Sequence, residues 1–304
     1  MKTRFLFPHQ LRSLGWILAL PGFGLGYLSV YRDYKIPGFG FSVWPRNEFF
    51  HGPVFQDLTN TLALILIIVG LLLVAFSKEK KEDELTSKMR QNALYWAVVI
   101  NYIAYLAWLL ATIGIQLLKL DKDALGSLSD ILGMSIYNLF TPLVIFIIRY
   151  YYLRYSKNGE YIVDRVYYLP EKPYKLIGKL ISIPLLGLVL LLCMYSWVSR
   201  NDVDLSGTGL DVMLLFLPLT LLIWGYSREK NEDEFVSTLR LESMQLAVYV
   251  NYAILLLANF LFYFFDFMLV MFFNLGTIVF FFVMRFNYIL WKHNKGIMKG
   301  TFAV

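Results

Sequence analysis

The sequence is poor in cysteine, histidine and charged residues. Its single cysteine, Cys193, lies in an apolar run and excludes an intrachain disulfide. The histidines, at positions 9, 51 and 293, are too scattered to form a metal-ligand cluster. Motifs for zinc binding, phosphate-binding loops and nucleophilic serine chemistry are absent. These absences favour a non-enzymatic protein with no catalytic residue, no metal and no cofactor.

The shortage of charge points to a membrane. Only 16% of the 304 residues are charged and 58% are hydrophobic, whereas soluble domains carry about 25% charged residues. Because roughly 20 apolar residues cross a bilayer as a helix, we predict an all-α integral membrane protein with eight transmembrane helices. The expected spans, none of which contains Asp, Glu, Lys, Arg or His, are 14–31, 58–76, 91–117, 131–148, 180–199, 212–226, 243–265 and 267–284.

Lys and Arg predict the orientation of these spans. With the N-terminus inside, 22 of the 28 Lys and Arg residues fall in inside segments and 6 fall outside. This positive-inside bias predicts that both termini lie in the cytoplasm. The N-terminal apolar run lacks a small-residue cleavage site, so we expect an uncleaved first span. The basic residues lie at span ends rather than in one patch, so direct nucleic-acid binding is not expected.

The chain contains an internal repeat. Residues 77–102 return as residues 227–252 with 12 of 26 positions identical and no gap. Outside this segment, Gly15 matches Gly178 and Arg149 matches Arg285. Four spans per half predict two parallel four-helix repeats about an axis along the membrane normal. We expect repeats at 1–155 and 176–304, joined by a cytoplasmic linker at 156–175.

The repeated segment supplies the main candidate site. Its shared polar residues are Glu82, Asp83, Glu84, Ser87 and Arg90 in the first copy and Glu232, Asp233, Glu234, Ser237 and Arg240 in the second. Helical spacing places Asp83, Ser87 and Arg90 on one face, and the acidic residues 79 and 82–84 are expected in the first helical turns. The segments predict a docking surface for a soluble cytoplasmic protein. The alternatives are a solvated face or a structural Asp83–Arg90 pair.

Four asparagines form a second candidate site. Asn101, Asn138, Asn251 and Asn274 each lie 11 residues from a boundary arginine, roughly 16 Å along a helix and thus near the midplane. Hydrogen bonding between spans is the favoured role. The alternative is a polar path at the repeat interface.

The loop between the first two spans breaks the repeat. Residues 31–60 combine prolines, glycines, aromatics and both signs of charge, whereas the matching loop near 200–211 is short. We predict an interfacial aromatic cap, with a functional covering loop as the alternative.

The sequence contains the run Glu-Asp-Glu, five residues and Arg, followed by Asn-Tyr, and its last span extends from Phe273 to Tyr288. Both parts resemble a set of uncharacterised bacterial multi-pass inner-membrane proteins. Proteins similar to these are thought to sit beside small helix-turn-helix regulators. The resemblance therefore implies a membrane partner that controls a soluble regulator, but it implies no activity.

Together these features favour a sensing or regulatory membrane protein whose partners are the lipid bilayer and a soluble cytoplasmic regulator. One alternative is a transporter of a neutral or lipidic solute along the asparagines. Another is a lipid-modifying enzyme whose acidic clusters hold a divalent cation.

Overall fold

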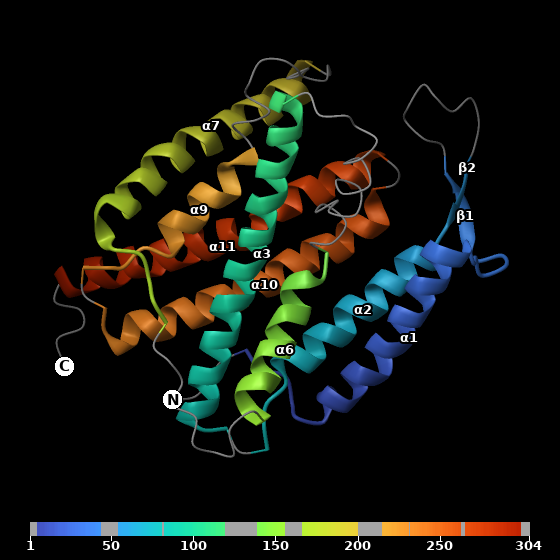
Figure 1. Ribbon diagram of the computed structural model, residues 1–304, viewed down its shortest axis with the longest axis horizontal. Coiled ribbons are helices and arrows are strands. Elements are labelled where there is room, and N and C mark those ends of the chain that lie inside the picture. The colour runs from blue at the N-terminus through green and yellow to red at the C-terminus, as the bar shows by residue number, and fades with distance from the viewer. Residues whose placement is uncertain are drawn as a thin grey trace.

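The computed structural model describes residues 5–43, 54–80, 82–118, 139–155, 166–199, 215–230, 232–262 and 265–298. These residues are mainly helical, as expected from the sequence (Figure 1). The helices are α1 Leu11–Arg32, α2 Thr59–Phe76, α3 Glu84–Leu118, α6 Thr141–Tyr155, α7 Leu176–Ser199, α9 Leu217–Gly225, α10 Glu234–Leu261 and α11 Phe265–Met298. A π-helical turn, η1 Glu171–Lys175, precedes α7.

Within the described residues, six helical segments are long and apolar enough to cross a membrane, as a multi-pass membrane protein requires. They are Leu11–Arg32, Thr59–Phe76, Glu84–Ala111, Glu171–Leu192, Glu234–Leu261 and Phe273–Lys295. The other two expected spans, 131–148 and 212–226, extend beyond the described residues. Their described parts are the 15-residue α6 and the 9-residue α9.

Small residues bring the first two helices of each half close together. A Cβ added at Gly15 on α1 would lie 2.7 Å from the Gly70 carbonyl oxygen on α2. A Cβ added at Gly178 on α7 would lie 2.7 Å from the Trp224 backbone nitrogen on α9. Both contacts are too short for any side chain, so glycine is required at these two positions of the repeat. Figure 1 shows the α1–α2 and α7–α9 pairs on opposite sides of α3 and α10.

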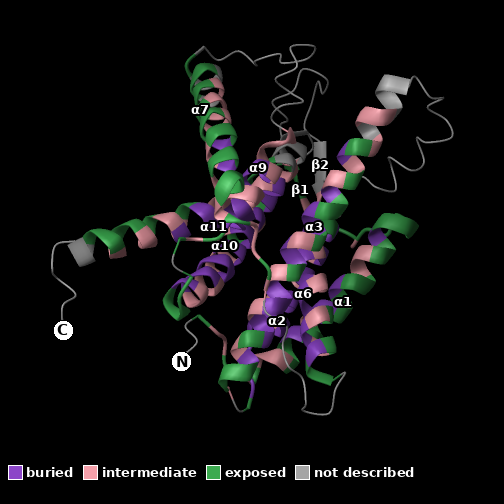
Figure 2. Cartoon of the chain, turned by 60° about the vertical axis from the view of Figure 1, so that its left-hand side comes forward, coloured by how far each residue is buried: buried purple, intermediate pink, exposed green. Residues whose placement is uncertain are grey.

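The buried core is one cluster that draws residues from both halves, and the outer helices expose apolar surface. Tyr105, Tyr252 and Phe282 are among the largest fully buried side chains, on α3, α10 and α11. Ile17 on α1 and Leu180 on α7 are 66% and 71% exposed. Figure 2 shows this difference as exposed residues along α1 and α7 and buried ones along α2 and α10. Apolar residues on the outside suit a surface that faces lipid rather than water.

The loop between α1 and α2 contains a short antiparallel hairpin that the sequence analysis missed. Strands β1 Gly40–Val43 and β2 Val54–Asp57 pair with Gly40 opposite Asp57. The backbone N–H of Ile36 donates to Thr59 Oγ1 at 3.0 Å and ties the loop to the start of α2. Four-residue strands are too short to give a clear alternation of apolar and polar residues.

Candidate functional site

The first copy of the repeated segment closes the bend between α2 and α3 around a buried arginine. Arg90 is 4% exposed, and its Nη2 donates to the Ser77 carbonyl oxygen at 3.0 Å. Glu82 Oε2 accepts from the same nitrogen at 3.3 Å and from the Glu79 backbone N–H at 2.9 Å. The arginine thus satisfies a carbonyl left without a helical partner where α2 ends.

The second copy makes the same contacts 150 residues later. Arg240 is 3% exposed, and its Nη2 donates to the Ser227 carbonyl oxygen and to Glu232 Oε1, both at 2.8 Å. Glu232 Oε1 also accepts from the Glu229 backbone N–H at 2.8 Å. Arg240 Nη1 donates to the Gly225 carbonyl oxygen at 2.7 Å. We call the end of the molecule that carries these two bends the motif end.

The aspartates of the repeat begin the two long helices, which corrects the expected helix start. Asp83 Oδ1 accepts from the Thr86 backbone N–H at 2.7 Å, and Asp233 Oδ1 accepts from the Val236 backbone N–H at 2.8 Å. Residues 79 and 82 therefore precede the helix instead of lying in its first turns. Asp83 serves as the N-cap and Arg90 pairs with Glu82, so the Asp83–Arg90 pair that was the structural alternative does not form.

Replacing both capping aspartates with alanine is expected to destabilise the protein by about 1 kcal/mol per cap. Hydrogen bonds from Thr86, which hold the pKa of Asp83 below its usual value, are lost in this variant. Unfolding in mixed micelles would measure the loss. The D83N/D233N variant should stay close to wild type, because asparagine caps as well as aspartate. Equal losses in both variants would contradict the capping role.

The burial of the repeated residues is uneven. The arginines are enclosed, whereas four carboxylates at the helix starts are exposed: Asp83, Glu84, Asp233 and Glu234. We call these four residues the acidic rim. Glu84 also pairs with the exposed Lys88 at 2.7 Å. The acidic rim is therefore available to a partner, beside exposed basic residues such as Lys80 and Lys230, and the two buried arginines belong to the framework beneath it.

The first half contains an additional charge cluster around Glu79. This carboxylate is 5% exposed and pairs with Arg12 at 2.5 Å and with Arg154. Tyr150 donates its hydroxyl to Glu79 Oε1 at 2.9 Å. Burial alone would raise the pKa of Glu79, but the hydrogen bonds from Arg12, Arg154 and Tyr150 outweigh burial and lower its pKa to about 2. Two guanidinium groups thus share one carboxylate.

The equivalent place in the second half is simpler. Glu229 pairs with Lys175 at 2.5 Å, and Lys175 stands where the first half has Arg12, 163 residues earlier. At an offset of 136, Phe286 and Leu290 replace Tyr150 and Arg154. Phe286 keeps the stacking role of Tyr150, since Arg240 lies 4.6 Å from its ring centroid and Arg90 lies 5.3 Å from that of Tyr150. Both halves therefore pair this glutamate, Glu79 or Glu229, with a cation, but only the first half adds a second cation, Arg154.

The two serines of the repeat have different surroundings. Ser237 on α10 accepts a hydrogen bond from Gln91 Nε2 on α3 at 2.9 Å through its Oγ. Gln91 Nε2 also approaches the Ser237 carbonyl oxygen at 3.3 Å. This contact joins the two halves near the starts of α3 and α10. Ser87 is only partly buried on α3.

Each half holds the segment that precedes the first helix of the other half. Tyr95 on α3 donates its hydroxyl to the Tyr167 carbonyl oxygen at 2.5 Å. In return, Gln245 and Tyr249 on α10 donate to the Phe5 carbonyl oxygen at 2.8 and 2.7 Å. We call this pair of contacts the reciprocal clasp. It was not predicted, although Gln245 lies 150 residues after Tyr95 and could have been found by following the repeat.

The clasped segments also pair with their own half. The Phe7 backbone N–H donates to the Phe76 carbonyl oxygen at 2.9 Å, and the Leu169 N–H donates to the Tyr226 carbonyl oxygen at 2.9 Å. Leu169 and Lys175 lie in the stretch 156–175 that was expected to be a linker, and Lys175 pairs with Glu229 of the second half. The described end of that stretch is therefore packed against the second half.

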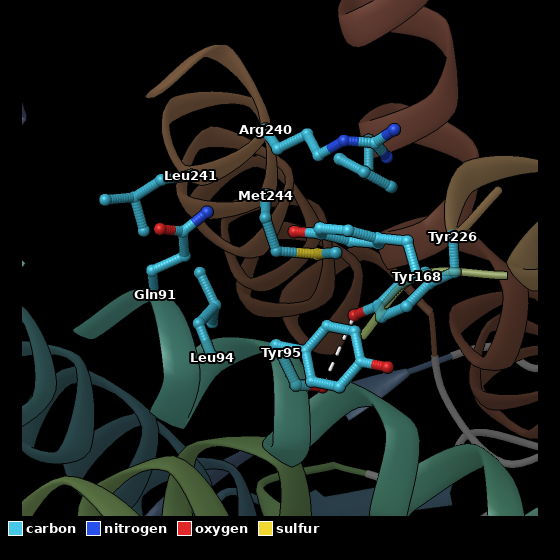
Figure 3. A pocket seen from close by; sticks show the side chains of 9 residues that line it. Gln91, Leu94, Tyr95, Tyr168, Tyr226, Arg240, Leu241 and Met244 are labelled. Atoms are coloured by element: carbon cyan, nitrogen blue, oxygen red, sulfur yellow. Dashed lines mark hydrogen bonds between the residues drawn. The ribbon is translucent and has the colours of Figure 1, made fainter. Parts of the chain in front are cut away.

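A small aromatic void lies beside the clasp (Figure 3). It encloses about 20 Å³, enough for roughly one water molecule. Tyr95, Tyr168 and Tyr226 pack with ring centroids 4.9–6.2 Å apart, and burial raises the pKa of Tyr168 to about 12. Arg240 lies 4.3 Å from the Tyr168 ring centroid. The void is too small for a solute, so it is part of the interface between the halves.

The described asparagines lie within the helix packing. Asn101, Asn251 and Asn274 are 2%, 1% and 5% exposed. Thr277 donates to Asn251 Oδ1 and also approaches the Asn274 side chain, so one hydroxyl connects asparagines of α10 and α11. This geometry matches hydrogen bonding between helices. Asn138 lies outside the described residues.

Comparison with known proteins gives no match to any family model, curated protein or solved structure. Within the described residues, no group of three or more His, Cys, Asp or Glu side chains is arranged to hold a metal ion. The exposed part of the repeat and the clefts beside it are therefore the candidate binding sites.

Proposed function

We propose that the chain is an eight-span inner-membrane protein made of two parallel four-span repeats, with the motif end and both termini in the cytoplasm. Contacts at matching positions support the repeat. Arg90 with Ser77 and Arg240 with Ser227 are related by 150 residues, and the clasp donors Tyr95 and Gln245 are separated by the same offset. The distribution of Lys and Arg supports the orientation.

We further propose a regulatory role, in which the acidic rim presents a negatively charged surface to a soluble cytoplasmic protein. The observation that carries this proposal is the exposure of all four carboxylates, while the arginines of the same repeat are buried. The Gln91–Ser237 contact brings the starts of α3 and α10 close to each other. Two negatively charged helix starts held by a rigid framework suit a basic partner surface, because complementary charge steers association.

The asparagines favour this role over transport. A solute path would need amides that face a passage, whereas Thr277 engages Asn251 and Asn274 at once. Asn251 is 1% exposed, which is typical of a polar group within helix packing.

The test is crosslinking in native membranes with the variant D83N/E84Q/D233N/E234Q. This variant removes four negative charges and keeps both helix caps, since asparagine replaces each capping aspartate. A soluble protein crosslinked to wild type should be lost or reduced at least tenfold in the variant. The control D33N, after the far end of α1, should crosslink like wild type. Equal crosslinking of the folded quadruple variant would overturn the docking proposal.

A further inference from the structure

A polar cleft opens at the motif end of the first half, and the Glu79 cluster forms part of its wall. It has a volume of about 550 Å³, within the range of roughly 300–1,000 Å³ that small-molecule sites occupy. The start of α1, the α2–α3 bend, the start of α3 and the end of α6 supply its walls. The lining residues are His9, Arg12, Glu79, Lys80, Asp83, Thr86, Met89, Tyr150 and Arg154.

The cleft has one more cation than carboxylate. Arg12 and Arg154 both pair with Glu79, and Lys80 and the exposed Asp83 also line the cleft, so one net positive charge remains. Glu79 contacts Nη1 of Arg154, and the Arg154 side chain is 35% exposed. Among the described residues, the Nε–Nη2 edge of that guanidinium has no other hydrogen-bond partner. Lys80 adds an exposed ammonium group on the same wall.

The second half shows which ion pairs the bend needs in order to form. There Glu229 is balanced by Lys175, and Leu290 stands in place of Arg154. Since the bend of the second half forms with a single ion pair, Arg154 is an addition specific to the first half. An extra arginine at a cleft, beyond what the shared framework uses, is a feature of a binding site rather than of the fold.

The position of the cleft matches the ends of two candidate spans. Arg12 is the second residue of the span Leu11–Arg32, and Glu79 follows the span Thr59–Phe76 by three residues. The cleft thus lies at the depth where lipid headgroups meet water. Arginine and lysine at this depth can contact the phosphate groups of lipids as well as soluble anions.

We propose that this cleft binds the phosphate group of a phosphate ester. Arg154 donates through its Nε–Nη2 edge, and Lys80 contributes a second positive charge. Glu79 keeps Arg154 and Arg12 in place and is not displaced. Arginine presents two parallel donors that match two phosphate oxygens, and lysine binds phosphate as a point charge. The ligand is either a phospholipid of the surrounding leaflet or a soluble phosphate ester. The cleft shares Asp83 with the acidic rim, but phosphate binding and docking have separate tests.

The experiment uses the full-length protein and separates the two sources of phosphate. Native mass spectrometry after reconstitution with phosphatidylglycerol in phosphatidylcholine tests the lipid, and calorimetry with glycerol 3-phosphate in nanodiscs of phosphatidylcholine alone tests the soluble ester. We expect saturable binding of one of them by wild type. R154L should weaken that binding about tenfold or more, because a charge-assisted pair is lost. K80Q should weaken it by about threefold, as expected for an exposed charge.

Two features make the test decisive. R154L reproduces the leucine of the second half and leaves the Arg12–Glu79 pair in place. K80Q changes an exposed side chain, so both variants retain the contacts that the two halves share. K230Q, at the matching lysine of the second half, should bind like wild type. Equal affinity of wild type, R154L and K80Q would overturn the proposal, as would the absence of binding to both probes. Loss in K230Q as large as in K80Q would show a general surface-charge effect and would also overturn it.

Discussion

Replacing Arg240 with leucine is expected to cost about 3–5 kcal/mol of unfolding free energy, the typical result of removing one partner of a buried ion pair. The side chain is 3% exposed and donates to two backbone carbonyl oxygens and to Glu232. Without the guanidinium, the carbonyls of Gly225 and Ser227 stay buried without their donor. The carboxylate of Glu232 also loses its positive partner. Each of these groups carries a desolvation penalty that the leucine cannot offset.

Unfolding in mixed micelles of R240L beside wild type would measure this loss. R240K is expected to recover only part of it, because lysine cannot reach two carbonyls and a carboxylate with a planar fork. The control is K88Q, which removes the charge of an exposed side chain in the first copy and should leave the melting temperature unchanged. A melting temperature of R240L equal to wild type would show that the buried arginine does not stabilise the bend.

The second large effect is expected for Glu79 replaced by glutamine. The neutral amide leaves Arg12 and Arg154 beside each other without the carboxylate that both now contact. The pKa of Glu79 is about 2 in the folded protein against an ordinary value of 4.5. Each tenfold change in proton affinity corresponds to about 1.4 kcal/mol, so ionised Glu79 contributes about 3 kcal/mol.

This contribution depends on pH in a definite direction. Because folding lowers the pKa of Glu79, the stabilisation is complete above pH 4.5 and is lost as the pH falls from 4.5 towards 2. The difference in unfolding free energy between wild type and E79Q should therefore shrink across this interval. A difference that stayed constant from pH 6 to pH 3 would mean that ionisation of Glu79 does not stabilise the fold.

The second half supplies the matched control for E79Q. Glu229 lies at the equivalent position and pairs with Lys175 alone. E229Q should therefore destabilise the protein less than E79Q, because only one cation loses its partner. Equal effects would mean that Arg154 adds nothing to the energy of the cluster.

The helical framework could be predicted from the sequence because it follows from local patterns. Long apolar runs without charge predicted eight spans, and six helical segments of the described residues are suited to cross a membrane. The ungapped match between residues 77–102 and 227–252 predicted two equivalent segments, and the structure gives both the same buried arginine and the same capping aspartate. These features depend on residues close together in the chain, so spacing was a sufficient guide.

The pairings between distant residues could not be predicted in this way. Helical spacing suggested Asp83 as the partner of Arg90, but the chain bends before Glu84 and brings Glu82 to the arginine instead. The cluster of Arg12, Glu79 and Arg154 joins three separate parts of the chain, and no local pattern specifies that they meet. The tyrosine hydroxyls of the reciprocal clasp bond to backbone carbonyls, which every residue carries, so the sequence gives no sign of the acceptor.

The reciprocal clasp has a consequence for how such a chain can originate. Phe5 is held by the second half and Tyr167 by the first, so each half lends its leading segment to the other. The same reciprocal contact arises in a symmetric homodimer, in which each of two identical subunits contacts the leading segment of the other across a two-fold axis. An ancestor with a single copy of the repeat could form the same contacts with a second copy of itself. Fusing the two copies would keep every contact and remove the requirement for association. It would also free Arg154 and Leu290 to diverge at positions that a symmetric dimer must keep identical.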